Sequence, residues 1–356
     1  MKLKLSNFAL FFISHLMLNI MCANAQVNIQ NNNDLPLFPT IEKNLSLNFP
    51  RDHGAHKDYR IEWWYLTANL KDLNDKPVGL QWTLFRAALD NEVQKTGWES
   101  SQVWMAHAAV TTENDHFFHE KFARGGTMQS NVVVEPFEAW IDDWYLKGTD
   151  WGNLTVTAKG ENFEYFLKLK SYGPIVKHGD NGRSIKSSSG QASAYYSQPF
   201  FQAKGWIKHN GQTLSVKGFA WADHEWSSQF LSETQNGWDW FSLHFDSGEK
   251  LMLFQVREKE KNHFYSGTWI DRSGNSRPLD PSQIILMPVK PDKSLNYATN
   301  WNIKVVNIGI DININAINSA SKMPTLYPYW EGPISFNGSH SGVGYLEMTG
   351  YLDEIN

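Results

Sequence analysis

Three ionisable residues stand in a row between tryptophans near the middle of the chain: Asp223, His224 and Glu225, within residues 218–226. On an extended strand Asp223 and Glu225 share one face and His224 takes the other, because successive side chains alternate. A carboxyl group among indole rings is desolvated, which raises its pKa and keeps it protonated near neutral pH. Asp223 is therefore a candidate general acid, which His224 and Glu225 would orient or tune. The alternative is a structural carboxylate bonded to an arginine or to backbone N–H groups.

A second group of such residues lies nearer the N-terminus. Residues 51–58 place two histidines beside two aspartates, but the spacing is not that of a known zinc site. We therefore expect a polar loop there and predict no metal. Glu62 follows, and it is either a buried acid or the ion-pair partner of Arg86 or Arg124.

Aromatic residues provide the candidate substrate-binding surface. The chain has 16 Trp and is 14% aromatic, which indicates wide apolar surfaces in a core or a lipophilic pocket. A lone histidine such as His107 on an apolar strand is more often hydrogen-bonded in the core than catalytic, and Tyr196 either lines a cavity or packs. The predicted substrate-binding residues are Glu62, Trp63, Trp64, His107, Tyr196, Trp221 and Trp226.

These side chains must be positioned by strands, because apolar and polar residues alternate along much of the chain. Residues 78–84, 163–169 and 308–314 follow this period of two. Turn sequences such as Asn210-Gly211 fall between the alternating runs. No long helical stripe is present, so the sequence predicts an antiparallel all-β protein.

Two aromatic hairpins indicate an internal duplication. Residues 62–86 and 238–257 each begin with an aromatic strand and end at an arginine, although a chance match in a β-rich chain is the alternative. We predict two lipocalin-like β-barrel or sandwich domains at 41–228 and 229–356. The Gly- and Ser-rich segment 177–193 is expected to be a long surface loop and is a candidate lid.

The first 25 residues have the features of an export signal. Two lysines precede a mostly apolar stretch at 8–20, and residues 23–25 have the small-x-small pattern that signal peptidase accepts. We expect cleavage after Ala25, a flexible tail at 26–40 and a periplasmic or secreted location. Lipidation of Cys22 is less favoured, because the residues before it make a poor lipoprotein motif.

Charge, cysteine content and missing motifs exclude several classes of function. The chain has 32 Lys+Arg against 37 Asp+Glu and a net charge of −5, which gives no basic footprint for nucleic acid. Its one cysteine lies in the predicted signal, so the mature chain lacks disulfides and thiolate nucleophiles. No nucleophile-elbow, phosphate-loop or dinucleotide motif is present, and we predict no cofactor. The expected partner is a lipophilic small molecule, with peripheral contact to a membrane.

Six motifs, taken in order, resemble the family of carotenoid 1,2-hydratases (hydroxyneurosporene synthases) and their AttH-type secreted relatives. They are 49–53, 62–65, 196–199, 221–226, 329–332 and 344–351. The resemblance implies two packed lipocalin-like domains. It also implies that Asp223 protonates an isoprenoid double bond before water captures the cation. Two residues depart from the hydratase pattern: Trp221 replaces a tyrosine and Glu225 replaces an asparagine.

The sequence therefore predicts an exported lipocalin-like hydro-lyase, isomerase or cyclase that acts by acid catalysis on an isoprenoid or other lipophilic alkene. One alternative is a non-catalytic carrier of a lipophilic ligand. A second alternative is a secreted hydrolase of unknown substrate.

Overall fold

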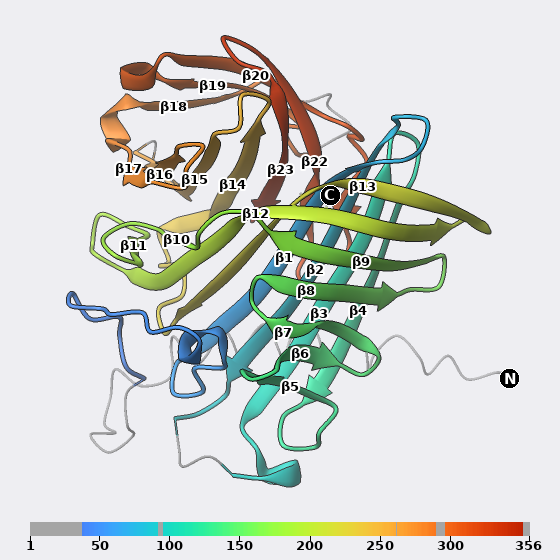
Figure 1. The fold of residues 1–356 in the computed structure, drawn as a ribbon. Helices are drawn as coiled ribbons and strands as arrows, with labels where there is room; N and C mark the ends of the chain where they lie inside the picture. The colour runs from blue at the N-terminus through green and yellow to red at the C-terminus, as the bar shows by residue number, and fades with distance from the viewer. Residues whose placement is uncertain (1–37, 92–94, 261, 290–295, 352–356) are drawn as a thin grey trace, which may run out of the picture. The chain divides into compact units, whose positions relative to one another are not determined.

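The fold is described from a computed structural model that covers residues 38–91, 95–260, 262–289 and 296–351. The predicted signal peptide and most of the predicted tail lie outside these residues. These described residues form one compact unit. Among the described residues, no helix combines the length and apolarity needed to cross a membrane. The structure is all-β, as the alternating pattern predicted, and its strands form two curled sheets (Figure 1).

The first sheet curls into a nearly closed barrel. Its strands pair antiparallel in the order β4-β3-β2-β1-β13-β12-β9-β8-β7-β6-β5, with β10 and β11 also paired to β12. The strands are β1 (Ile61–Lys71), β2 (Pro77–Ala88), β3 (Gln102–Thr112), β4 (His116–Arg124), β5 (Ser130–Val133), β6 (Phe137–Ile141), β7 (Trp144–Asp150), β8 (Asn153–Lys159), β9 (Phe163–Ser171), β10 (Val176–Lys177), β11 (Arg183–Ile185), β12 (Ala192–His209) and β13 (Gln212–Ser227).

The second sheet forms a half-barrel. Its order is β17-β16-β15-β14-β23-β22-β20-β19-β18, and β21 pairs with β22. The strands are β14 (Gln235–Phe245), β15 (Lys250–Glu258), β16 (Phe264–Ile270), β17 (Ser276–Pro278), β18 (Ile284–Pro288), β19 (Asn300–Val305), β20 (Ile310–Ala316), β21 (Lys322–Met323), β22 (Tyr329–Gly338) and β23 (Gly342–Thr349). Short 3-10 turns occur at η1 (Arg51–His53), η2 (Gly97–Glu99), η3 (Pro281–Gln283) and η4 (Val306–Ile308).

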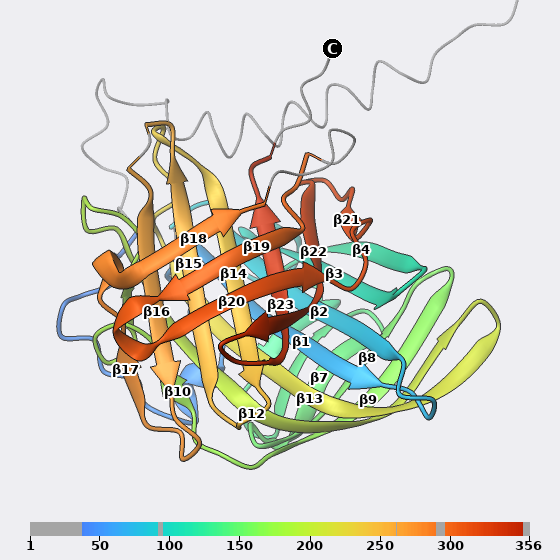
Figure 2. The ribbon, with the colours of Figure 1, turned by 90° about the horizontal axis from the view of Figure 1, so that it is seen from above.

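The two sheets pack face to face. Strands β22 and β23, coloured red, lie beside β1 and β2 in both views (Figure 1 and Figure 2). The Asn69 amide donates directly to the Gly344 carbonyl at 2.8 Å. Because side chains alternate along β1, Trp64 lies in the barrel core and Tyr65 lies on the opposite face. There Tyr65 packs with Trp240 of the second sheet.

The two predicted hairpins are present as β1–β2 and β14–β15. Each pairs a buried acid with an arginine: Glu62 with Arg86 at 2.8 Å, and Asp239 with Arg257 at 2.6 Å. The chain passes from the first sheet to the second between β13 and β14. Because both sheets lie in one compact unit, their independence as two domains stays a prediction.

The segment 177–193 differs from the expected surface loop. It contains the short strand β11 and the last residue of β10, both paired to β12. His178 within it is fully buried. The pattern of glycines and serines concealed this, because short strands that pair on a neighbour need no apolar alternation of their own.

Candidate functional site

A row of polar residues crosses the face of the first sheet that packs against the second sheet. Strand register places these residues directly opposite one another on successive strands. Cross-strand partners point to the same face of a sheet and lie within contact distance. In order from β12 to β4, the row is Ser197, Asp223, Tyr65, Thr83, His107 and Glu120.

Asp223 is the carboxyl group at the centre of the site. Its side chain is 3% exposed and accepts hydrogen bonds from Ser197 Oγ, from Trp221 Nε1 at 2.6 Å and from the Tyr195 hydroxyl at 3.0 Å. Burial raises the pKa of Asp223 to about 7, although these three hydrogen bonds each lower it. No arginine or lysine pairs with it among the described residues, so the carboxyl holds a proton over much of the neutral range.

His178 connects Asp223 to the second sheet. Its Nε2 lies 2.6 Å from Ser197 Oγ, and its Nδ1 lies 2.9 Å from Thr268 Oγ1 of β16. Burial lowers the pKa of His178 to about 3, so the ring is neutral. Ser197 Oγ donates its proton to Asp223, so it accepts a hydrogen bond from His178 Nε2. The ring proton of His178 therefore lies on Nε2.

Glu225 has a different environment on the same face. Lys186 Nζ lies 2.7 Å from its carboxylate, and Ser193 also donates to it. Lys186 comes from the segment 177–193 and lies over the rings of Tyr195 and Phe254. The pair therefore holds this segment against the site and makes Glu225 an ion-pair partner.

The second sheet adds two more carboxyl groups to the interface. Glu331 on β22 is 2% exposed and accepts a hydrogen bond from Tyr65, while Glu347, opposite it on β23, accepts from Trp238 at 2.8 Å. Burial raises the pKa of Glu331 well above its ordinary value and that of Glu347 to about 7. Next to the last residue of the row, Glu120, His107 bonds to the Tyr329 hydroxyl of the second sheet at 2.9 Å.

A separate polar cluster lies inside the barrel, on the far side of β1 and β13. Glu62 contacts Arg86 at 2.8 Å, His56 at 2.7 Å and His224 at 2.9 Å. Burial disfavours ionisation of Glu62, but Arg86 and the two histidines together hold its pKa well below the usual range. His56, Glu62 and His224 bring three potential metal ligands within 4.8 Å of one another. The adjacent Arg86 guanidinium already supplies the cation, so the set fits an ion-pair network better than a metal site.

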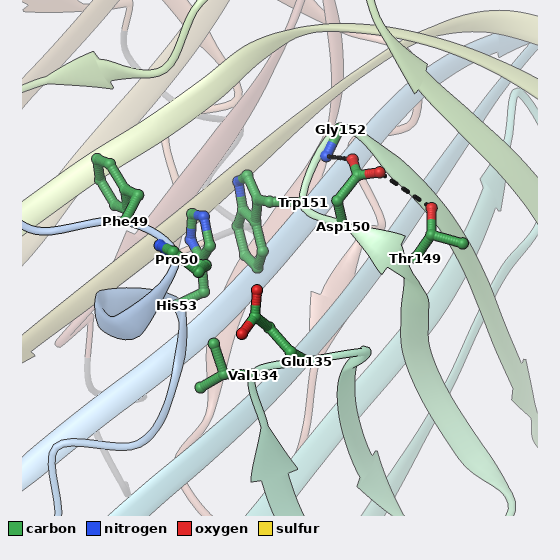
Figure 3. Close-up of a pocket in the computed structure, with 9 residues that line it drawn as sticks. All are labelled: Phe49, Pro50, His53, Val134, Glu135, Thr149, Asp150, Trp151 and Gly152. Carbon is green, nitrogen blue, oxygen red and sulfur yellow. Dashed lines mark hydrogen bonds between the residues drawn. The ribbon is translucent and has the colours of Figure 1, made fainter.

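The interior cluster extends to a pocket at the barrel rim. Tyr196 bonds to His224 Nδ1 at 3.0 Å and to His53 Nδ1 at 2.7 Å. The His53 ring is stacked between Phe49 and Trp151 at 4.7 and 4.6 Å, and it lines a pocket of about 370 Å³ (Figure 3). This pocket does not include Asp223.

The structure divides the predicted site residues between these two places. Asp223, Glu225, Trp63, Trp221 and His107 lie on the face between the sheets. His224, Glu62, Trp64, Tyr196 and Trp226 belong to the barrel interior, whose core and polar cluster they form. The expected opposition of Asp223 and Glu225 to His224 is confirmed, and so is the pairing of Glu62 with Arg86. The catalytic and binding roles stay predictions.

Sequence reasoning missed several residues of the interface. Tyr65 and Ser197 belong to recognised motifs, but only strand register shows that they flank Asp223. Glu331 lies in another of these motifs, but nothing in its local sequence shows that it reaches Tyr65. His178 lay in a segment expected to be exposed, so no local signal marked it.

Comparisons with known proteins agree with this architecture. The family model described as AttH-like matches residues 40–351. The crystal structure of a candidate AttH from Nitrosomonas europaea is 31% identical, with a TM-score of 0.79 over 88% of this chain and 100% of that chain. The structure of kievitone hydratase from Nectria haematococca is 13% identical, with a TM-score of 0.65 over 91% and 96%. No curated protein matches the sequence.

Proposed function

Since this chain belongs to the AttH-like family, we propose that it is a hydratase-type enzyme in which Asp223 adds a proton to a lipophilic alkene. The observation that carries the proposal is the state of Asp223. It is a buried, proton-holding carboxyl without a cationic partner among the described residues, set beside Trp221 at the junction of two sheets.

The chemistry follows from the surroundings of this carboxyl. In hydration the O–H bond of Asp223 breaks as its proton forms a C–H bond with one alkene carbon. A lone pair of water then forms the C–O bond at the other carbon, and a proton of that water returns to Asp223. The donors Ser197, Trp221 and Tyr195 stabilise the carboxylate between these steps, and aromatic faces such as Trp240 stabilise the cation.

Water addition is favoured over isomerisation by one comparison. Kievitone hydratase shares this fold and is by name a hydratase. The shared fold supports a scaffold of the same kind. The proposed substrate, an isoprenoid or related alkene, rests on the motifs around Asp223.

The test is turnover of a panel of isoprenoid alkenes in deuterated water, followed by mass spectrometry. We expect wild-type protein to form an alcohol with one carbon-bound deuterium, and Asp223→Asn to lose about 100-fold or more of the rate. Asp239→Asn is the matched control, because Asp239 is equally buried but paired with Arg257 away from this face. It should lower thermal stability and retain turnover below its melting temperature.

Two results would contradict the proposal. Unchanged turnover in Asp223→Asn would remove this residue as the acid. Quenching of tryptophan fluorescence by the alkenes, with no product from any of them, would identify a carrier.

We also propose that the N-terminal 25 residues direct export to the periplasm or the medium. The two lysines, the apolar stretch at 8–20 and the pattern at 23–25 support this. Expression of the full chain in a bacterial host, followed by N-terminal sequencing, should find Gln26 as the first residue of the exported protein. An intact Met1 in that fraction would contradict cleavage.

A further inference from the structure

Glu331 has one buried carboxyl oxygen without a hydrogen-bond partner among the described residues. Tyr65 donates to its Oε1, and Oε2 has no hydrogen-bond partner among the described residues. Burial and the nearby Glu347 raise the pKa of Glu331 well above its ordinary value, so the group is neutral. A neutral carboxyl can donate its proton from Oε2, the oxygen that has no partner. The Tyr329 hydroxyl interacts with the same carboxyl, which lowers the pKa of Glu331 in part, and it also bonds to His107 Nδ1 at 2.9 Å.

Strand β2, which faces β22, carries a second buried oxygen without a partner. Gln81 is 1% exposed, and its Nε2 donates to Thr83 while its Oε1 has no partner. Gln81 lies on the same face of β2 as Thr83, to which it bonds, and Thr83 lies opposite Tyr65 in the sheet. The Gln81 amide is therefore in the same part of the interface as Tyr65. Strands β2 and β22 are in close contact there, since a Cβ on Gly79 would lie 2.5 Å from Pro333. Buried polar groups without partners are rare, so two on facing strands call for a ligand.

We propose that Glu331 and Gln81 form an oxygen subsite that binds the hydroxyl group of a lipophilic alcohol. The hydroxyl oxygen accepts from Glu331 Oε2, and its proton is donated to Gln81 Oε1. A hydroxyl is the smallest substituent that offers both functions. This inference rests on the proposed function, because it names the product end of the same site. Water before the addition and the alcohol oxygen after it would occupy the same position.

The experiment compares the dissociation constants of octan-1-ol and octane, measured by quenching of tryptophan fluorescence. In Glu331→Leu and in Gln81→Met we expect the preference for the alcohol to fall about tenfold relative to wild type, because each variant removes one hydrogen bond. Glu331→Gln should keep most of the preference, because an amide also has a donor and an acceptor.

Gln255→Met is the matched control. Gln255 is also buried and its Oε1 has no partner among the described residues. It lies on the same face of β15 as Leu251 and Leu253, so it faces the core of the second sheet. It should leave the ratio of the two dissociation constants unchanged. If Glu331→Leu does not fold, Gln81→Met still decides the question.

Three results would overturn the subsite: equal losses for alcohol and alkane in both variants, a change of the ratio in Gln255→Met as large as in Gln81→Met, or no binding of either probe to wild type. The proposed acid is tested separately. Loss of turnover in Asp223→Asn with no effect of Gln81→Met on the ratio would retain the hydratase and remove the subsite.

Discussion

The buried state of Asp223 makes a quantitative prediction about stability and pH. The pKa of an aspartate in an unfolded chain is about 4, whereas burial raises that of Asp223 to about 7 in the folded protein. Between these values the unfolded chain releases a proton that the folded protein retains, so rising pH favours unfolding. Each pKa unit of difference between the two states corresponds to about 1.4 kcal/mol of stability, so the difference for Asp223 corresponds to about 4 kcal/mol.

Asp223→Asn removes this titration, because an amide does not ionise. The assay is urea unfolding at intervals from about pH 4 to about pH 8. We expect the free energy of unfolding of wild type to fall by about 4 kcal/mol relative to the variant across this range, with no further change above the folded pKa. The difference in slope is the test, since the amide also changes hydrogen bonding by an amount that pH does not alter.

Asp311→Asn provides the control for this measurement. Asp311 is exposed and paired with Lys304, which together with Asn302 lowers its pKa, so its titration falls below the chosen range. Its profile should run parallel to wild type. Parallel profiles for wild type and Asp223→Asn would refute the reasoning, because Asp223 would then be ionised equally in the folded and unfolded states.

Two further predictions concern ion pairs. Arg86→Met should lower the free energy of unfolding, measured in urea, by about 3–5 kcal/mol, because it leaves Glu62 buried without its cation. Adding Glu62→Gln should recover part of that loss. Additive effects of the two substitutions would contradict the coupling. Lys186→Met should speed proteolytic cleavage within 177–193, because it releases the contact of this segment with Glu225. Lys304→Met, which breaks an exposed pair, should leave that cleavage rate unchanged.

Local sequence determined the class of the protein and the orientation of its central motif. Alternation with a period of two is a property of neighbouring residues, so it reveals strands and places Asp223 and Glu225 opposite His224. The type of residue also carries information, since carboxyls among tryptophans indicate desolvation. These signals gave the all-β architecture, the two hairpins and the candidate acid.

Only the tertiary structure decided which residues meet that acid. Tyr65 and Ser197 flank Asp223 through pairing across more than 150 and about 26 positions of chain respectively, and Glu331 reaches Tyr65 from the other sheet. Register and sheet packing arise from the summed fit of many side chains, which no short segment encodes. Alternation shows which residues share a face of a strand, but it does not show which of the two faces packs against a second sheet. For that reason Trp64, Tyr196 and Trp226, which were predicted to bind substrate because aromatic side chains can line a lipophilic pocket, lie in the barrel core.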